Sequence, residues 1–183
     1  MKQAILLHGT GGSDNDYFWF SDTKSFLEKN GYDVWWPLLP NTNSPNLQET
    51  VEFVEEEMPP IDEESIIICH SSACPLILYM MQFFLISVKQ VILVSGYYEK
   101  INNESNSMLP DSFDWSEIKS KSKEFILINS ENDPWKCTDE QARIAAKSLE
   151  SPLIVNFGQG HMGSGSFNQP YREFPLLKRL IKT

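Results

Sequence analysis

The sequence feature that most constrains the fold is a strand-to-helix junction near the middle of the chain. It begins with three isoleucines at 66–68, a β-branched run that is typical of a buried strand and too short for a helix. A helical pattern with few breakers follows over residues 70–81. Ser71 therefore lies where a strand turns into a helix. This is the position of a nucleophile elbow, whose sharp turn lifts a serine oxygen above the sheet.

The elbow departs from its usual consensus sequence, Gly-x-Ser-x-Gly. Here the five residues are Cys69-His70-Ser71-Ser72-Ala73, so both glycines are replaced by other small residues. The flanking side chains must be small because a nucleophile held at positive φ, a strain of about 1–3 kcal/mol, crowds the strand against the helix. We expect Cys69 and Ala73 to fit.

Strand patterns alternate with helix patterns along the whole chain. The predicted strands are residues 3–7, 32–36, 66–68, 90–95, 124–129 and 153–157, and the predicted helices are residues 18–29, 47–58, 70–81, 138–149 and 170–181. Residues 96–121 form a long irregular excursion. Without repeats or linkers, this order predicts one α/β domain over residues 1–183, with a mostly parallel sheet of about six strands and helices on both faces.

Charge and hydropathy limit the partners of the protein. The net charge is −10, and no cluster of lysine and arginine is present to contact phosphates. We therefore expect neither a nucleic acid nor an anionic membrane as a partner. The apolar run before Gly9 is shorter than a signal-peptide core, and no apolar run approaches the ~20 residues of a membrane span. These features predict a cytoplasmic protein.

The cysteines predict neither a disulfide framework nor a zinc site. There are three of them, an odd number, and they lack metal-ligand spacing and partner histidines. We expect a reducing environment, no metal and no cofactor.

Three predicted loops carry residues suited to nucleophilic catalysis. In a parallel sheet, reacting groups lie in loops at the carboxyl ends of the strands. Ser71 follows the strand at 66–68, Asp133 follows the strand at 124–129, and His161 lies in a glycine-rich loop after the strand at 153–157. The chain order Ser, Asp, His is that of the α/β-hydrolase triad.

Other side chains compete for the acid and the base. Glu131 is close to Asp133, but we expect its longer side chain to face solvent, while the shorter one suits a tight turn. His8 and His70 adjoin strand ends, so we expect them to pack or to position backbone. His161 alone lies on a loop that is free to reach across to the serine.

The cysteines compete for the role of nucleophile. Cys69 ends a buried strand and Cys74 enters the helix, so both are expected to be inert packing residues. Cys137 lies near a helix start, a position that can lower a thiol pKa, but no histidine adjoins it in sequence.

Several segments together carry a family resemblance: His8-Gly9-Thr10-Gly11-Gly12, Cys69-His70-Ser71-Ser72-Ala73, Val94-Ser95-Gly96-Tyr97, Phe113-Asp114-Trp115, Asn132-Asp133-Pro134 and Gly160-His161. With them the chain resembles, nearly from end to end, the small serine-hydrolase family of retinoblastoma-binding protein nine and the bacterial YdeN-like hydrolases. These are α/β-hydrolases without a large cap domain. The tail over residues 163–177 is closer to the bacterial members.

The resemblance implies a role for each candidate residue. Ser71 is the nucleophile, Asp133 the acid and His161 the base, and in the triad mechanism the N–H groups of Thr10 and Ser72 hold the oxyanion. The family has Gly-His-Ser-Ser-Gly at the elbow, from which this chain departs at both glycines. No Leu-x-Cys-x-Glu segment is present, so we infer no pocket-protein partner, and any protein partner is unknown.

Aromatic residues near the predicted loops suggest a substrate class. Trp19, Tyr97 and Trp135 are candidate substrate contacts, and residues 97–115 are the one stretch long enough to act as a lid. An open, aromatic-edged cleft suits a small carboxylic ester, with an amide as a further class. The sequence thus predicts a serine hydrolase. The alternative is a catalytically silent hydrolase fold that serves as a binding module, because both elbow glycines are missing.

Overall fold

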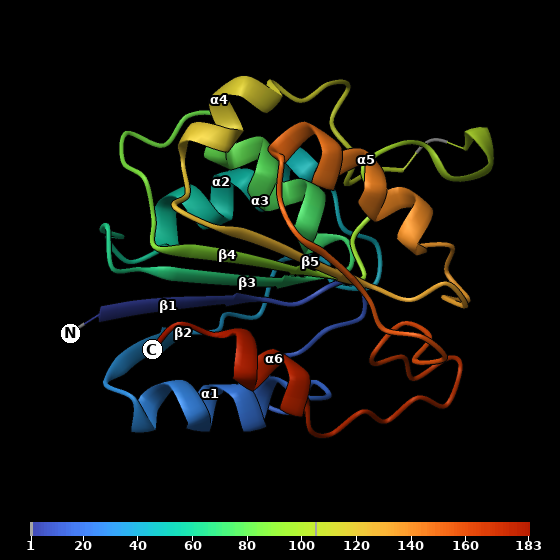
Figure 1. Ribbon diagram of the computed structural model, residues 1–183, viewed down its shortest axis with the longest axis horizontal. Helices are drawn as coiled ribbons and strands as arrows, with labels where there is room; N and C mark the ends of the chain where they lie inside the picture. The colour runs from blue at the N-terminus through green and yellow to red at the C-terminus, as the bar shows by residue number, and fades with distance from the viewer. Residues whose placement is uncertain (1, 105) are drawn as a thin grey trace.

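The computed structural model describes residues 2–104 and 106–183, and its centre is a single six-stranded sheet (Figure 1). The strands are β1 (Lys2–Leu7), β2 (Tyr32–Trp35), β3 (Ile66–His70), β4 (Gln90–Val94), β5 (Phe125–Asn129) and β6 (Leu153–Val155). They are ordered β2-β1-β3-β4-β5-β6, and every neighbouring pair is parallel. The predicted mostly parallel α/β sheet is confirmed.

Helices cover both faces of the sheet, as Figure 1 shows. One face carries α1 (Phe20–Lys29) and α6 (Pro175–Leu180), and the other carries α2 (Leu47–Glu57), α3 (Ala73–Met81), α4 (Trp115–Ser120) and α5 (Asp139–Leu149). Because helices cover both faces, every residue of the central strands β3, β4 and β5 is buried, whereas the edge strands β2 and β6 are partly exposed.

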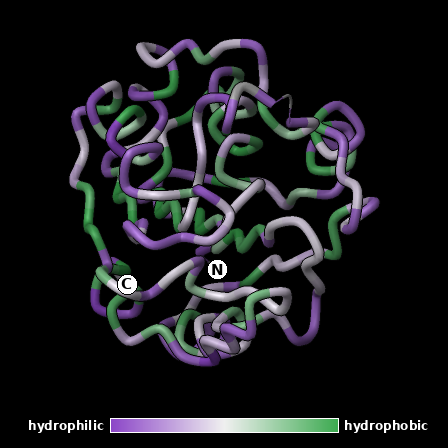
Figure 2. The backbone as a smooth tube through the Cα atoms, turned by 90° about the vertical axis from the view of Figure 1, so that its right-hand side faces the viewer, coloured by the Kyte–Doolittle hydropathy of each residue, from purple (hydrophilic) through white to green (hydrophobic). Residues whose placement is uncertain are grey.

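The core divides into two layers because successive strand side chains point to opposite faces. In β3, Ile67 and Cys69 pack with the side of α2 to α5, while Ile66 and Ile68 pack with the side of α1 and α6. Figure 2 shows apolar stretches running through the middle of the molecule and polar stretches along its outside. All five residues of β3 are buried, which fixes the elbow at its end.

The structure refines the predicted elements at three places. The excursion over 96–121 is not wholly irregular, since it contains the short 3-10 helix η1 (Ile101–Asn103) and α4. Helix α4 begins where the Asp114 side chain accepts a hydrogen bond from the Glu117 N–H at 3.0 Å, a cap that the sequence analysis missed. The last helix begins at Pro175 rather than Pro170, and β6 ends at Val155.

Within the described residues, none of the helices has the length and hydropathy that a membrane crossing requires.

Candidate active site

A cavity of about 610 Å³ opens at the carboxyl ends of the strands. Its walls come from the loops after all six strands, as expected for a parallel sheet. The residues that line it include Thr10, Phe18, Ser71, Ser72, Tyr97, Trp135, Cys137, His161 and Ser164. Ser71 and His161, far apart in the sequence, therefore share one cavity.

Ser71 occupies the sharp turn between β3 and α3. Its φ is +55°, in the left-handed region that a nucleophile elbow requires. The Ser71 N–H donates to the Val94 carbonyl at 2.9 Å, and the Ser71 carbonyl accepts from the Cys74 N–H at 2.9 Å. These backbone bonds hold the turn in place.

The elbow forms without its usual glycines. Cys69 and Ala73 are both fully buried and pack into the core beside α3, so these small side chains are accommodated as predicted. The glycine that the turn does require lies on the loop after β1. A Cβ on Gly9 would lie 2.6 Å from the Ser71 Cβ, closer than real Cβ contacts allow. Gly9 thus permits the approach of the Ser71 side chain to the β1 loop.

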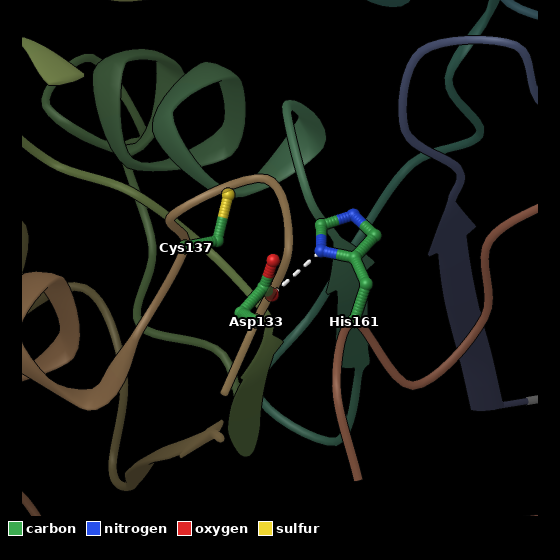
Figure 3. A group of neighbouring side chains, drawn as sticks. All are labelled: Asp133, Cys137 and His161. Atoms are coloured by element: carbon green, nitrogen blue, oxygen red, sulfur yellow. Dashed lines mark hydrogen bonds and ion pairs between the residues drawn. The ribbon is translucent and has the colours of Figure 1, made fainter. Parts of the chain in front are cut away.

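Asp133 and His161 form a buried hydrogen-bonded pair (Figure 3). Their Oδ2 and Nδ1 atoms lie 2.7 Å apart, and the two residues are 3% and 5% exposed. An ionised carboxylate only accepts, so the proton of the pair is on Nδ1 and the Nε2 lone pair is free. The other oxygen of Asp133 accepts the Trp135 N–H at 2.8 Å, which fixes the carboxylate plane.

Glu131 makes different contacts. It is exposed, and its carboxylate accepts the Gly158 N–H at 3.1 Å, which ties the β5 loop to the β6 loop. Asn132 adds a second tie, since its Oδ1 accepts the Gly160 N–H at 2.8 Å. The acid that contacts the His161 ring is therefore Asp133, as preferred from the sequence.

The backbone of His161 is held on both sides. Its carbonyl accepts from His70 Nε2 at 2.9 Å and from the Ser95 hydroxyl at 3.0 Å, while its N–H donates to Gln169 Oε1 at 2.9 Å. His70 thus positions backbone, as predicted. The contributions of Ser95 and Gln169 were missed, because only the folded chain brings these residues to the β6 loop.

The ring of His70 is fixed in one tautomer. Its Nε2 carries the proton that it donates to His161, so its Nδ1 accepts the Tyr17 hydroxyl at 3.0 Å. Complete burial, together with the adjacent His161 ring, lowers the pKa of His70 well below the usual value. His70 is therefore a neutral donor to the His161 carbonyl.

His8 also positions backbone, as predicted. Its Nε2 accepts the Leu39 N–H at 3.0 Å, so its Nδ1 donates to the Gly9 carbonyl at 2.8 Å. Burial lowers the pKa of His8, which favours this neutral form.

The hydroxyl of Ser71 is not hydrogen-bonded to His161 in this structure. Within residues 2–104 and 106–183, the His161 ring is bonded to Asp133 and the neighbouring Ser72 hydroxyl to Thr10, but the Ser71 hydroxyl has no protein partner. Catalytic hydrogen bonds are often long before substrate binds and tighten in the complex. Both groups line the same cavity, so a turn of the Ser71 side chain about χ1 can change their separation.

The two expected oxyanion-hole donors differ in their present contacts. The Thr10 N–H donates to the Ser72 hydroxyl at 2.9 Å, and the Thr10 hydroxyl lies 3.0 Å from the same oxygen. Among the described residues, the Ser72 N–H has no hydrogen-bond partner. One donor is free, and the other is bonded to a side-chain hydroxyl.

Two of the three aromatic candidates line the cavity. Tyr97 and Trp135 do so, and the Trp135 indole N–H donates to the Ser164 hydroxyl at 3.1 Å. Trp19 does not, because its side chain is fully buried, and the prediction of a substrate contact there is wrong. Its indole N–H instead donates to the Met162 carbonyl at 2.9 Å, which holds the loop that carries His161.

The cysteines are all free and buried. Cys69 and Cys74 pack in the hydrophobic core, and burial raises the pKa of both thiols well above the usual value, which favours the unreactive thiol form. Burial and the charge of Asp133 also raise the pKa of Cys137, which favours its neutral thiol form. Its place in the cavity wall beside His161 was missed, because no histidine adjoins it in sequence.

A parallel sheet with a serine elbow, an acid after a late strand and a histidine after the last strand defines the α/β-hydrolase class. Comparison with known proteins narrows this class. The profile of the Serine hydrolase family matches residues 4–181, so the chain belongs to the serine hydrolase family. It is an esterase-like α/β-hydrolase family, and its members are hydrolases.

Individual relatives agree with this assignment. The chain is 25% identical to the YdeN protein of Bacillus subtilis (strain 168) over 136 residues, which cover 72% of this chain and 71% of that one. The crystal structure of the B. subtilis ydeN gene product superposes with a TM-score of 0.88 at 21% identity, over 98% of this chain and 96% of that one. Est1E from Butyrivibrio proteoclasticus, solved with ferulic acid, has the same fold, with a TM-score of 0.64 at 11% identity over 99% and 90%.

Proposed function

We propose that the protein hydrolyses small, uncharged carboxylic esters through an acyl-enzyme on Ser71, with His161 as the base and Asp133 as the residue that orients it. One observation carries the proposal. The 2.7 Å contact of Asp133 with His161 Nδ1 leaves Nε2 of that ring free, in the cavity that also holds the elbow serine.

The reaction follows the triad scheme. His161 Nε2 takes the Ser71 proton as Oγ attacks the acyl carbon, and Asp133 stabilises the imidazolium that forms. The developing oxyanion accepts from the free Ser72 N–H and from the Thr10 N–H, where the substrate oxygen replaces the Ser72 hydroxyl. The protonated His161 then donates to the leaving alcohol, and water hydrolyses the acyl-enzyme with the same base.

The wall of the cavity supports an uncharged substrate. Among the described residues that line it, no Asp, Glu, Lys or Arg is present, although the chain as a whole carries a net charge of −10. Phe18, Tyr97 and Trp135 supply apolar surface. A charged substrate group would lose its hydration there without an ionic partner. Small amides, which are also uncharged, are a second substrate class.

Turnover of p-nitrophenyl esters of increasing acyl length tests the proposal. Wild-type protein should hydrolyse short-chain esters, and Ser71→Ala should fall to the background rate. Ser120→Ala, on the exposed helix α4, is the matched control and should keep the wild-type rate. A Ser71→Ala protein as active as wild type would overturn the proposal.

The alternative of a silent binding module rests on the unpaired Ser71 hydroxyl and the covered Thr10 N–H. It predicts that folded wild-type protein turns over none of these esters or the corresponding anilides. The same assay therefore separates the two functions.

A further inference from the structure

A thiol lies beside the Asp133–His161 pair. A carboxylate oxygen of Asp133, the sulfur of Cys137 and a ring nitrogen of His161 all lie within 4.8 Å of one another. All three residues are buried, and Figure 3 shows the carboxylate between the thiol and the imidazole. We call these three side chains the thiol–carboxylate–imidazole cluster.

The cluster has the chemistry of a site for a thiophilic divalent cation. Thiolate sulfur, imidazole nitrogen and carboxylate oxygen are the three ligand types of zinc sites, and three protein ligands leave one position open. Zinc–ligand bonds of about 2.0–2.3 Å require ligand atoms roughly 3.3–3.8 Å apart in a tetrahedron. The most distant ligand atoms, now within 4.8 Å of one another, would approach by up to about 1 Å, and the 2.7 Å contact of Asp133 with His161 would widen by about 0.6 Å. Cys137 and His161 both line the cavity, which supplies the entry path.

We propose that Asp133, Cys137 and His161 bind a thiophilic divalent cation such as Zn²⁺, and that its binding switches the hydrolase off. The switch rests on the proposed function, whereas the cation site stands on the cluster alone. Spacing along the sequence gave no sign of it, because Cys137 and His161 lie on different loops.

Cation binding would disable the base in a defined way. The Cys137 thiol loses its proton to solvent, and the thiolate and the Asp133 carboxylate together balance the charge of the cation. The neutral imidazole coordinates through Nδ1, so its proton moves to Nε2. A protonated Nε2 cannot accept the Ser71 proton, and Asp133 no longer orients the ring. The bound cation and ester hydrolysis therefore exclude each other.

The first test measures ester hydrolysis by wild-type protein with Zn²⁺, Cd²⁺ or Mg²⁺, followed by EDTA. Zn²⁺ and Cd²⁺ should inhibit, and EDTA should restore the rate. Mg²⁺ should have no effect, because it prefers oxygen ligands and octahedral geometry. Equal inhibition by Mg²⁺, or none by Zn²⁺ and Cd²⁺, would overturn the proposal.

The second test assigns the inhibition to the cluster. Cys137→Ser and Cys137→Ala should each need at least about 100-fold more Zn²⁺ for half-inhibition. Removing a residue that only hydrogen-bonds to a metal ligand already costs about 10–100-fold in metal affinity, and Cys137 is itself a ligand. Rates with and without Zn²⁺ are compared within each variant, so a changed basal rate cancels. Cys74→Ala, which removes a buried cysteine outside the cluster, should stay as sensitive as wild type. Wild-type sensitivity in both Cys137 variants would contradict the site.

The third test needs no activity. Equilibrium dialysis should find one Zn²⁺ per wild-type chain that is lost in Cys137→Ser, and Co²⁺ should give a thiolate charge-transfer band only with Cys137 present. Binding through Cys137 by a protein that hydrolyses no ester would support the cation site and overturn the proposed function. If the protein hydrolyses esters, Zn²⁺ leaves the rate unchanged and no zinc binds through Cys137, the proposed function would be supported and the cation site overturned.

Discussion

The two sides of the cavity are held in different ways. On one side, the His161 carbonyl accepts two hydrogen bonds, its N–H donates to Gln169, and its ring is bonded to Asp133. On the other side, the Ser71 backbone is fixed in the elbow, but its hydroxyl has no partner among the described residues. In the proposed mechanism, this difference means that the base His161 is pre-positioned, whereas the side chain of the nucleophile Ser71 is oriented when substrate binds.

The largest expected effect is on the histidine side. Asp133→Asn should lower kcat by about 10⁴-fold with little change in folding, because the amide keeps the shape of the side chain but misorients the imidazole. Steady-state ester hydrolysis measures this, and circular dichroism reports folding. Glu131→Gln is the matched control and should stay active, since Glu131 contacts the Gly158 N–H rather than the ring. If Glu131→Gln lost activity and Asp133→Asn kept it, Asp133 would not be the acid that orients the His161 ring.

A smaller effect is expected from the residue that holds the His161 backbone. His70→Ala should lower kcat by up to about 100-fold, the cost of a misplacement near 1 Å, while KM changes little. His70→Gln, which keeps a side-chain N–H donor, should recover part of the loss. A fall in KM and kcat together, or no recovery with Gln, would argue that His70 serves only as packing.

Acid should lower the stability of the folded protein, and the histidines responsible are His70 and His8. The folded protein holds His70 and His8 neutral with lowered pKa values, while in the unfolded chain they bind protons below about pH 6.5. The unfolded state then binds more protons, so the free energy of unfolding falls with falling pH, by up to about 1.4 kcal/mol per unit for each histidine. Above about pH 6.5 both states hold these histidines neutral, so the free energy of unfolding keeps its full value with respect to them.

Urea unfolding between about pH 7 and about pH 5 measures this slope. His70→Gln should be less stable at neutral pH but show a shallower loss toward acid. An identical slope in wild type and variant would mean that His70 does not titrate on unfolding.

The smallest effect is expected on the serine side. Cys69→Gly and Ala73→Gly restore the consensus sequence of the elbow, but Ser71 already has the required positive φ. The double variant should hydrolyse esters at a similar rate and lose roughly 0.5–1 kcal/mol of stability per glycine through backbone entropy. A strong gain in rate would show that the side chains of Cys69 and Ala73 hinder the elbow.

The sequence predicted what depends on local pattern. The six strands, the Ser71 turn and the preference for Asp133 over Glu131 followed from periodicity, turn chemistry and the family resemblance. Apart from the local Asp114 cap of α4, the missed features depend on contacts between distant loops. Trp19 was expected in the cleft but packs beneath the His161 loop, and Cys137 was set aside although it lines the cavity. Such contacts are set by the packing of loops against each other, which no local pattern encodes.

The most direct test of the account is labelling with a fluorophosphonate, followed by peptide mapping of the adduct. The probe captures a serine only when a base activates it and an oxyanion hole faces it. Wild-type protein should take up one label on Ser71, with none in Ser71→Ala and almost none in His161→Ala. Labelling of Ser72 instead, or a folded wild-type protein that resists the probe over hours, would contradict the assignment of Ser71 as the activated nucleophile.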